Sequence, residues 1–173
     1  MAVIETSPKK ALTLTVLDIE IAVAKHFDYR SHVIVPNVFW GLGFRHELDV
    51  LVMSGSGYVT EIEIKTSRAD LRRDLKKTHG HRSLKICRHF LAVPKSLSAL
   101  AIKLFPQDWG VLGVDEEMRW VEVMRNAKRN KNAKPLETSD INHLYKLASM
   151  RTWTLKQTLA DRIDRQRLQA PGA

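Results

Sequence analysis

A stretch near the middle of the chain constrains the fold more than any other. From residue 45 to 67, apolar and charged side chains alternate on both sides of a Gly-Ser-Gly sequence at 55–57. Alternation with a period of two is typical of β-strands, and a short glycine-containing connection is typical of a hairpin. Because alternate side chains of a strand lie on one face, we expect Glu61, Glu63 and Lys65 to lie together.

The first strand of this hairpin carries acidic side chains as well, because Glu47 and Asp49 share one of its faces. If that face coincides with the face of Glu61 and Glu63, several carboxylates converge beside Lys65. Clustered carboxylates repel one another unless a cation neutralises them, and a hard divalent ion with oxygen ligands fits that requirement. The alternative is a surface face on which these side chains form ordinary cross-strand ion pairs.

The composition bounds the class of protein. A chain of 173 residues with 44% hydrophobic residues can form one domain, or one domain with a helical extension. The net charge of +9 favours a polyanionic partner. The single cysteine, Cys87, excludes an intrachain disulfide and a zinc site built from cysteines, and we expect it to be a packing residue.

The sequence contains neither an apolar run of membrane-spanning length nor the apolar core of a signal peptide. We therefore expect a cytoplasmic protein of a bacterial or phage-infected cell, with no membrane partner.

Helical and strand periodicity predicts the other elements. We expect a helix that begins near Thr13 or Thr15 and ends near Phe27, a strand over 32–38, the central hairpin, a helix over 68–77, a strand over 88–93, a helix over 97–105, a second hairpin over 109–124 and a long helix from Thr138 or Ser139. This order predicts an α/β fold in which helices flank a central mixed sheet.

We expect residues 1–134 to form this domain and residues 135–173 to form a C-terminal helical extension that packs on it. The last residues, 166–173, should fray. The apolar residues of the extension recur at helical spacing and should form its packed face: Ile141, Leu144, Tyr145, Ala148, Leu155, Leu159 and Ile163.

The pattern formed by Asp49, thirteen intervening residues and then Glu63-Ile64-Lys65 resembles the bipartite motif of the PD-(D/E)XK nucleases, the restriction-endonuclease-like superfamily. Leu48 stands where the name-giving motif has proline, and members without that proline are common. The resemblance covers residues 18–123 and extends to small phage and bacterial members. It also rests on His46-Glu47, Glu61, Asp70-Leu71, Lys76-Lys77, His79 and His81.

The resemblance implies a restriction-endonuclease-like core and Mg²⁺-dependent hydrolysis of phosphodiester bonds, in DNA rather than RNA, with Mn²⁺ as a substitute ion. Asp49, Glu63 and the backbone carbonyl of Ile64 are the implied metal ligands. Lys65 is implied to lie near the attacking water, where its charge stabilises the developing negative charge. Glu20 resembles the acidic residue that many of these nucleases contribute from their first helix.

Other residues of the pattern have two interpretations each. Glu47 and Glu61 are either ligands of a second metal or ordinary surface acids, and His46 should point away from the acidic pair because its strand parity is opposite. Two sets of basic residues are candidates for contact with nucleic-acid phosphates, against the alternative that they are simply solvated. The first set is Lys76, Lys77 and His81, and the second, in a loop without acidic residues, is Lys128, Arg129 and Lys131.

Two other classes of function remain open. The first is a nuclease-like fold that has lost catalysis and serves as a nucleic-acid-binding or assembly subunit. The presence of Asp49, Glu63 and Lys65 together argues against that loss. The second is a basic ribonucleoprotein component without a metal, which leaves the acidic cluster unexplained. A homodimer is compatible with the sequence.

Overall fold

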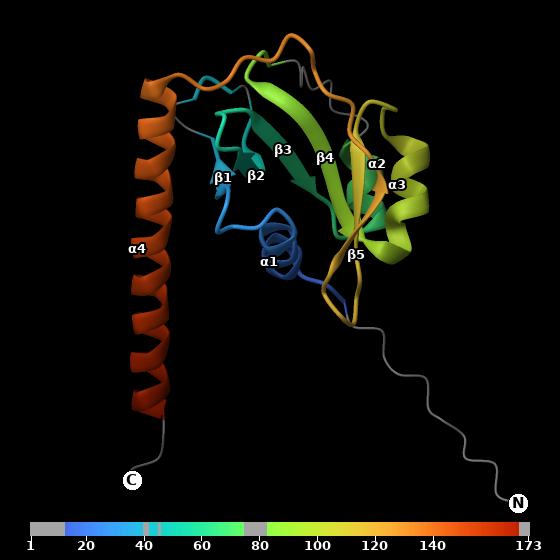
Figure 1. Cartoon of the computed structure of the whole chain (residues 1–173). Helices are drawn as coiled ribbons and strands as arrows, with labels where there is room; N and C mark the ends of the chain where they lie inside the picture. The colour runs from blue at the N-terminus through green and yellow to red at the C-terminus, as the bar shows by residue number, and fades with distance from the viewer. Residues whose placement is uncertain (1–12, 40–41, 45, 75–82, 170–173) are drawn as a thin grey trace, which may run out of the picture.

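A six-stranded mixed sheet forms the centre of the protein (Figure 1). The structure is a computed structural model that describes residues 13–39, 42–44, 46–74 and 83–169. The strands follow the order of the chain across the sheet, and only the β3–β4 and β4–β5 pairs are parallel. They are β1 (Val33–Val38), β2 (Leu48–Met53), β3 (Val59–Ile64), β4 (Ile86–Pro94), β5 (Gly110–Val114) and β6 (Val121–Arg125).

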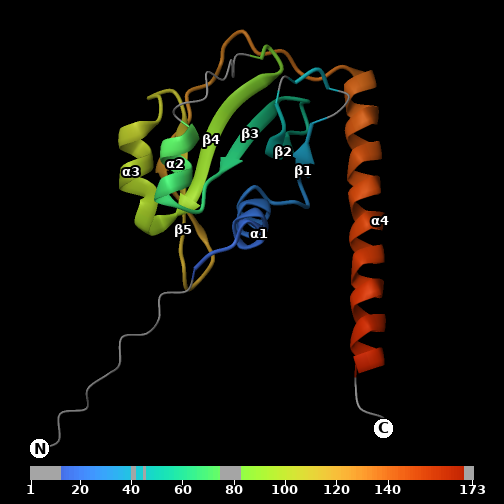
Figure 2. The same ribbon diagram turned by 180° about the vertical axis from the view of Figure 1, so that it is seen from behind.

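Helices cover both faces of the sheet, which confirms the predicted α/β class (Figures 1 and 2). Helix α1 packs on one face, and α2, α3 and the first turns of α4 pack on the other. The helices are α1 (Val16–His26), α2 (Arg68–Asp74), α3 (Ser98–Leu104) and α4 (Thr138–Gln169), with a 3₁₀ turn, η1 (Lys95–Leu97), before α3.

Helix α1 begins where the sequence predicts, because Thr15 caps it. The Thr15 hydroxyl accepts a hydrogen bond from the Asp18 N–H, and the Asp18 carboxylate accepts one from the Thr15 N–H, which together form a capping box. Ile19 and Val23 are fully buried against the sheet. This packing leaves Glu20, the residue after Ile19, partly buried at the edge of the packed face.

Strand β3 divides its side chains between the two faces as its alternation predicts. Ile62 and Ile64 pack in the cluster that contains α1, whereas Glu61, Glu63 and Lys65 lie on the opposite face. The three charged residues are nevertheless buried, with exposed fractions of 0%, 9% and 7%. The alternative of an exposed face with ordinary surface ion pairs is therefore wrong for this strand.

The remaining boundaries differ modestly from the predicted ones. Strand β4 is longer than the predicted strand over 88–93, because the buried residues Ile86 and Cys87 belong to it. The expectation that Cys87 is a packing residue is confirmed. The predicted helix over 68–77 is observed to Asp74, and its last residues lie outside the described ranges.

The C-terminal helix packs on the domain over its first turns only, which corrects the expectation of a packed face along its length. Leu144 and Leu147 are buried against the β1 edge of the sheet, but Leu155, Leu159 and Ile163 are exposed. A helix of 32 residues is about 48 Å long. A strand of six residues such as β1 spans only about 20 Å, so α4 extends far beyond the sheet (Figure 1).

The end of α4 also differs from the prediction. Residues 166–169, which were expected to fray, continue the helix to Gln169. Residues 170–173 lie outside the described ranges.

Candidate active site

The hairpin places Asp49 and Glu63 next to each other on neighbouring strands. Val50 pairs with Ile62 in the antiparallel register, so Asp49, one residue earlier on β2, lies opposite Glu63 on β3. The Asp49 Oδ2 atom accepts a hydrogen bond of 2.7 Å from the backbone N–H of Ile64. The two carboxylates that the sequence predicts as metal ligands are therefore brought together by strand register.

The environment of Asp49 opposes its negative charge. Burial raises the pKa of the Asp49 carboxyl from an ordinary 3.8 to about 6, and repulsion from Glu63 and Glu47 adds to that increase. The hydrogen bond from Ile64 and the charge of Lys65 act in the opposite direction and only partly offset it. A carboxylate in this state gains stability from an additional positive charge nearby.

Lys65 provides one positive charge at this site. Its Nζ atom donates a hydrogen bond of 2.5 Å to Glu63 Oε1, and both side chains are almost fully buried. The backbone N–H of Lys65 donates to the carbonyl of Ala92 on the neighbouring parallel strand, which continues the sheet one residue beyond β3. The lysine that the sequence predicts as catalytic thus lies in direct contact with a predicted ligand.

Glu20 lies close to this group of residues. Burial raises the pKa of its carboxyl, and repulsion from Asp49 raises it further. An electrostatic interaction of this kind requires the two carboxyls to be near each other. The structure therefore brings Glu20 of α1 to the same end of the sheet as Asp49. Glu47, in contrast, is exposed.

A second charged cluster surrounds Glu61 and was not predicted from the sequence. The Glu61 side chain is fully buried, with His46 Nε2 2.7 Å from its Oε1 atom and His89 Nδ1 3.0 Å from its Oε2 atom. The ring of His89 stacks on Trp109 at a centroid distance of 5.2 Å. One carboxylate thereby connects β3, β4 and the segment before β2.

The position of His46 corrects the expectation that it points away from the acidic residues. His46 precedes β2, which begins at Leu48, so strand parity does not determine its direction. The hydrogen bond with Glu61 raises the pKa of the His46 imidazole, and the charges of Glu63 and Asp49 also raise it. One feature of the sequence could have predicted this cluster. Glu61 and Glu63 are two residues apart on one strand, so Glu61 lies on the same face as the candidate site.

The donor atoms fit a magnesium ion better than a transition metal. Mg²⁺ commonly binds to one or two carboxylates and completes its shell with water and substrate oxygens. Asp49, Glu63 and the Ile64 carbonyl offer that kind of donor set, and burial followed by repulsion from Glu63 raises the pKa of Asp49. Among the described residues, no group of three or more His, Cys, Asp and Glu side chains is arranged to hold a metal ion by itself.

The structure separates the predicted basic loop from the carboxylates. The loop crosses the end of the sheet where β3 and β4 begin, with the Lys128 N–H bonded to the Asp108 carbonyl (Figure 1). Arg129 lies 5.0 Å from the ring of Tyr58, which precedes Glu63 by five residues, or about 16 Å along a strand. Lys76, Lys77 and His81 lie outside the described residues.

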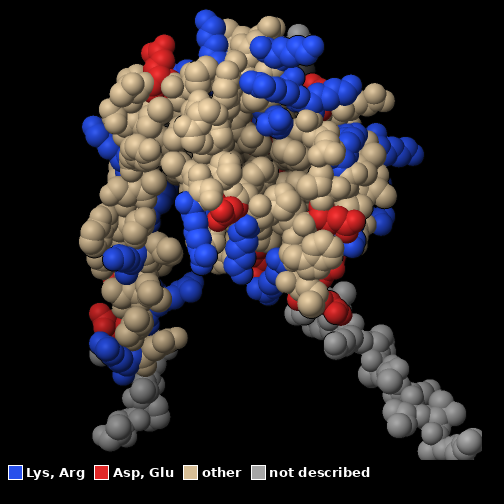
Figure 3. Space-filling model, in the orientation of Figure 1, with Lys and Arg blue, Asp and Glu red and all other residues tan. Residues whose placement is uncertain are grey.

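Lys and Arg side chains are spread over this face of the molecule. Figure 3 shows many of them on the upper part, where the loop that contains Lys128, Arg129 and Lys131 lies, and others on the lower part and along α4. A nucleic acid bound at both places would have to extend along the length of β3.

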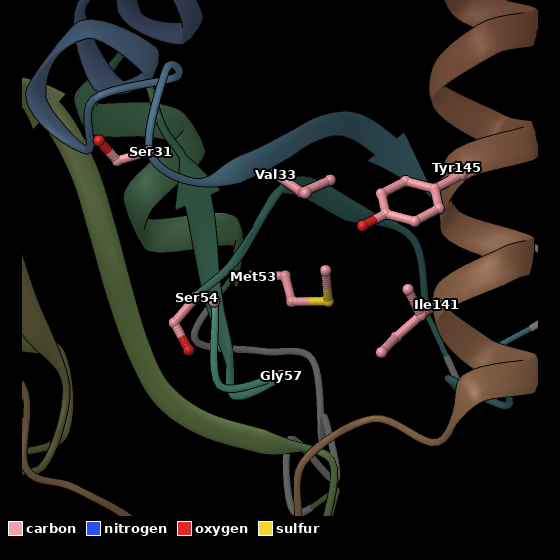
Figure 4. A pocket seen from close by; sticks show the side chains of 8 residues that line it. Ser31, Val33, Met53, Ser54, Gly57, Ile141 and Tyr145 are labelled. Atoms are coloured by element: carbon pink, nitrogen blue, oxygen red, sulfur yellow. The ribbon is translucent and has the colours of Figure 1, made fainter.

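A small pocket lies elsewhere, between α4 and the β2–β3 turn (Figure 4). Its volume is about 140 Å³, and Met53, Ile141 and Tyr145 are among the residues that line it. None of the predicted site residues lines this pocket. It is at the turn end of the hairpin, away from Glu63, so the candidate active site is a different place.

Comparison with known proteins supports the fold alone. The sequence matches no protein-family model, and it matches no curated protein. Among solved structures, it is similar to the SPO1766 protein of unknown function from Silicibacter pomeroyi, with 24% sequence identity and a TM-score of 0.60. The alignment covers 90% of this chain and 95% of that chain. Since residues 1–134 are less than 90% of the chain, the match extends into the C-terminal helical region.

Within the described ranges, no helix combines the length and the apolar character that crossing a membrane requires.

Proposed function

We propose that the protein is a metal-dependent nuclease that hydrolyses phosphodiester bonds in DNA. The observation that carries this proposal is the convergence of Asp49, Glu63 and Lys65 at one end of the hairpin, in buried or partly buried positions. The order of a helix, three antiparallel strands, a helix and a parallel strand supports a restriction-endonuclease-like core.

The side chains at this site have complementary roles in the proposed reaction. Asp49, Glu63 and the Ile64 carbonyl would hold Mg²⁺, which supplies positive charge to activate water and to neutralise the phosphate. Lys65 is in contact with Glu63, and its ammonium would orient the attacking water and stabilise negative charge as the phosphorus–oxygen bond breaks. Glu20, at the edge of the site, would accept a hydrogen bond from a water molecule there.

The Glu61 cluster would position the site rather than take part in the reaction. Its two histidine contacts connect β3 to β4 and to the segment that leads into Asp49. A buried carboxylate with partners on both oxygens restrains the strands that carry the reacting groups. His46, with 22% of its side chain exposed, is the member of this cluster that a substrate can reach most easily.

One observation favours a second candidate, an inactive nuclease fold that binds nucleic acid. Lys65 already neutralises Glu63 through a contact of 2.5 Å, so this carboxylate has a partner without any metal. An inactive binding subunit would retain this ion pair as a structural feature. Metal binding separates the two candidates, because only the nuclease requires Glu63 to be shared between the ammonium and an ion.

The experiment that tests the proposed site is a calorimetric titration with Mn²⁺. We expect the wild-type protein to bind Mn²⁺ and Asp49→Ala to lose that binding. Asp108→Ala, at an exposed aspartate before β5, is the control and should bind as the wild type does. Equal binding by the wild type and Asp49→Ala would remove Asp49 from the role of ligand.

A second experiment tests the basic loop. DNA binding should be measured in Ca²⁺, which supports binding without turnover in many nucleases, over a range of salt concentrations. Replacement of Lys128, Arg129 and Lys131 by alanine should reduce the slope of log affinity against log salt by up to about three, because each phosphate contact contributes about 0.9. An unchanged slope would show that the loop is solvated and does not contact phosphate.

A further inference from the structure

Beyond Ser149, α4 leaves the body of the domain, and the contact that remains among the described residues is a hydrogen bond from the Arg151 guanidinium to the Asn37 carbonyl of β1. Every residue from 149 to 167 is exposed. These include Leu155, Leu159 and Ile163, with exposed fractions of 70%, 57% and 40%. Most helices in proteins are stabilised by the packing of an apolar face rather than by intrinsic propensity. This segment carries such a face and leaves it uncovered.

The three apolar residues form a stripe at one edge of the packed face of the helix, because the buried residues Leu144 and Leu147 lie about 60° and 120° to one side of it. Leu159 follows Ile141 by about five turns and therefore lies on the same line, with Leu155 and Ile163 about one turn to either side. Ile141 packs toward β2 and lines the pocket with Met53 (Figure 4). The stripe thus points toward the side of the domain, past the edge of the sheet.

The space beside this stripe is open. Figure 3 shows a gap in the molecular surface between the lower part of α4 and the body of the domain. On α1, Leu17 and Ile21 are also exposed, with exposed fractions of 62% and 46%. An apolar surface of this kind is typical of an interaction site.

Positive charges flank the stripe on both edges. Lys156 and Arg162 lie three residues before and three residues after Leu159, which places them on opposite sides of it. The Lys156 ammonium lies 4.9 Å from the centre of the Trp153 ring, at the outer edge of this side. Asp161 and Asp164 lie on the far side of the helix, where Asp161 accepts a hydrogen bond from Gln157. A partner that covers the stripe therefore meets cations at its edges.

The apolar stripe and the charges beside it distinguish between the kinds of molecule that could bind there. A second copy of α4 would bring Lys156 and Arg162 against cations, in a chain whose net charge is already +9. A flat membrane cannot lie along the stripe, because the domain stands on the same side of the helix. A nucleic acid would leave the apolar side chains uncovered. A helix with an apolar stripe between acidic edges satisfies both the apolar and the charged requirements.

We propose that the stripe of Leu155, Leu159 and Ile163, with its edges at Lys156 and Arg162, is a docking site for an acidic amphipathic helix of another protein. This proposal does not depend on the proposed nuclease activity.

The test uses the full-length protein and two synthetic helical peptides of about 20 residues, close to six turns. Both peptides have Leu at the a and d positions of each heptad. One has Glu at the e and g positions, and the other has Lys. Fluorescence anisotropy should show that the Glu peptide binds at least tenfold more tightly than the Lys peptide. Leu159→Asp should weaken binding of the Glu peptide at least tenfold.

Met150→Asp is the matched control. Met150 is 60% exposed and lies about two and a half turns before Leu159, on the opposite side of the helix. Both variants change the net charge equally, so a non-specific attraction between the acidic peptide and the basic protein affects them equally. We expect Met150→Asp to bind as the wild type does. Circular dichroism should show equal helical content in the two variants.

Several results would overturn the proposal. No binding of the Glu peptide, or equal weakening by Leu159→Asp and Met150→Asp, would show that the stripe is not a docking site for an acidic helix. A dimer in sedimentation velocity that Leu159→Asp dissociates would make a second copy the occupant. Binding to phosphatidylserine vesicles that Leu159→Asp abolishes would make a lipid surface the occupant.

Discussion

Replacement of Asp49 by asparagine should stabilise the metal-free protein near neutral pH. The pKa of the Asp49 carboxyl is raised from an ordinary 3.8 to about 6, first by burial and then by repulsion from Glu63. A shift of about two units corresponds to about 3 kcal/mol against the ionised form, since each unit is about 1.4 kcal/mol. Because the side chain is only partly buried, we expect a gain in unfolding free energy of about 2 kcal/mol.

The sign of the pH dependence follows from the direction of the shift. The folded state holds the proton of Asp49 more tightly than the unfolded state, so stability decreases as the pH rises through the raised pKa. Asparagine stays neutral and still offers an oxygen to the Ile64 N–H. The difference between variant and wild type should therefore be full above about pH 7 and vanish below about pH 4.

The assay is urea denaturation of both proteins across this pH range in the presence of EDTA. Asp115→Asn is a control with the opposite sign, because hydrogen bonds from the Met118 and Glu117 N–H groups lower the pKa of Asp115. That variant should be less stable than the wild type at neutral pH. An Asp49→Asn protein that is no more stable than the wild type near pH 7 would refute the electrostatic reasoning about the site.

Three other changes test separate parts of the structure. Lys65→Ala should fold, keep most of its DNA affinity and cleave at least about a hundredfold more slowly in an oligonucleotide assay, whereas Lys65→Arg should not restore the rate. Glu61→Gln should lower the unfolding free energy by about 3 kcal/mol. The loss should decrease as the pH rises through the raised pKa of His46, because the charged imidazole that stabilises Glu61 is then lost, as urea denaturation at several pH values would show. Removal of the chain beyond Ser149 should change the thermal midpoint little, because those helical residues are exposed and so is the hydrogen bond from Arg151 to the Asn37 carbonyl that is lost with them. Leu144→Ala, in contrast, should lower the unfolding free energy by about 2–5 kcal/mol, because its side chain is fully buried.

Each of the three has a result that would contradict it. Wild-type cleavage by a folded Lys65→Ala protein would remove the lysine from the reaction. A loss of stability in Glu61→Gln that does not vary with pH would show that the charge of His46 is not involved. A large decrease in the thermal midpoint on truncation would show that the end of α4 packs on the domain.

The sequence predicted the central part of the fold because local patterns determine it. Alternation in the hairpin placed Glu61, Glu63 and Lys65 on one face, and the capping residue Thr15 marked the start of α1. Both features depend on residues that are close together in the sequence. The approach of Asp49 to Glu63 also followed from a short hairpin, in which the register leaves little freedom.

Features that depend on long-range packing were not predictable in the same way. His46 turns toward Glu61 although strand parity suggested otherwise, because it lies before β2 begins and its direction depends on tertiary contacts. Helical periodicity showed that α4 has apolar residues at regular spacing. It could not show that α4 extends past the sheet, so that Leu155 and the residues after it have no sheet to pack against. Whether an apolar helix face is buried depends on how far the neighbouring sheet extends. The periodicity of the helix sequence carries no information about that length.

Single-turnover cleavage of plasmid and oligonucleotide DNA, with Mg²⁺ and with EDTA, tests whether Asp49, Glu63 and Lys65 form a nuclease centre. We expect cleavage by the wild type that requires the metal and falls at least about a hundredfold in Asp49→Asn and in Lys65→Ala. Lys95→Ala is the control, since Lys95 of η1 forms an exposed ion pair with Glu122 of β6, and it should cleave at the wild-type rate. DNA binding by the wild type without cleavage under either condition, or cleavage that Asp49→Asn retains, would contradict the assignment of this site as a nuclease centre.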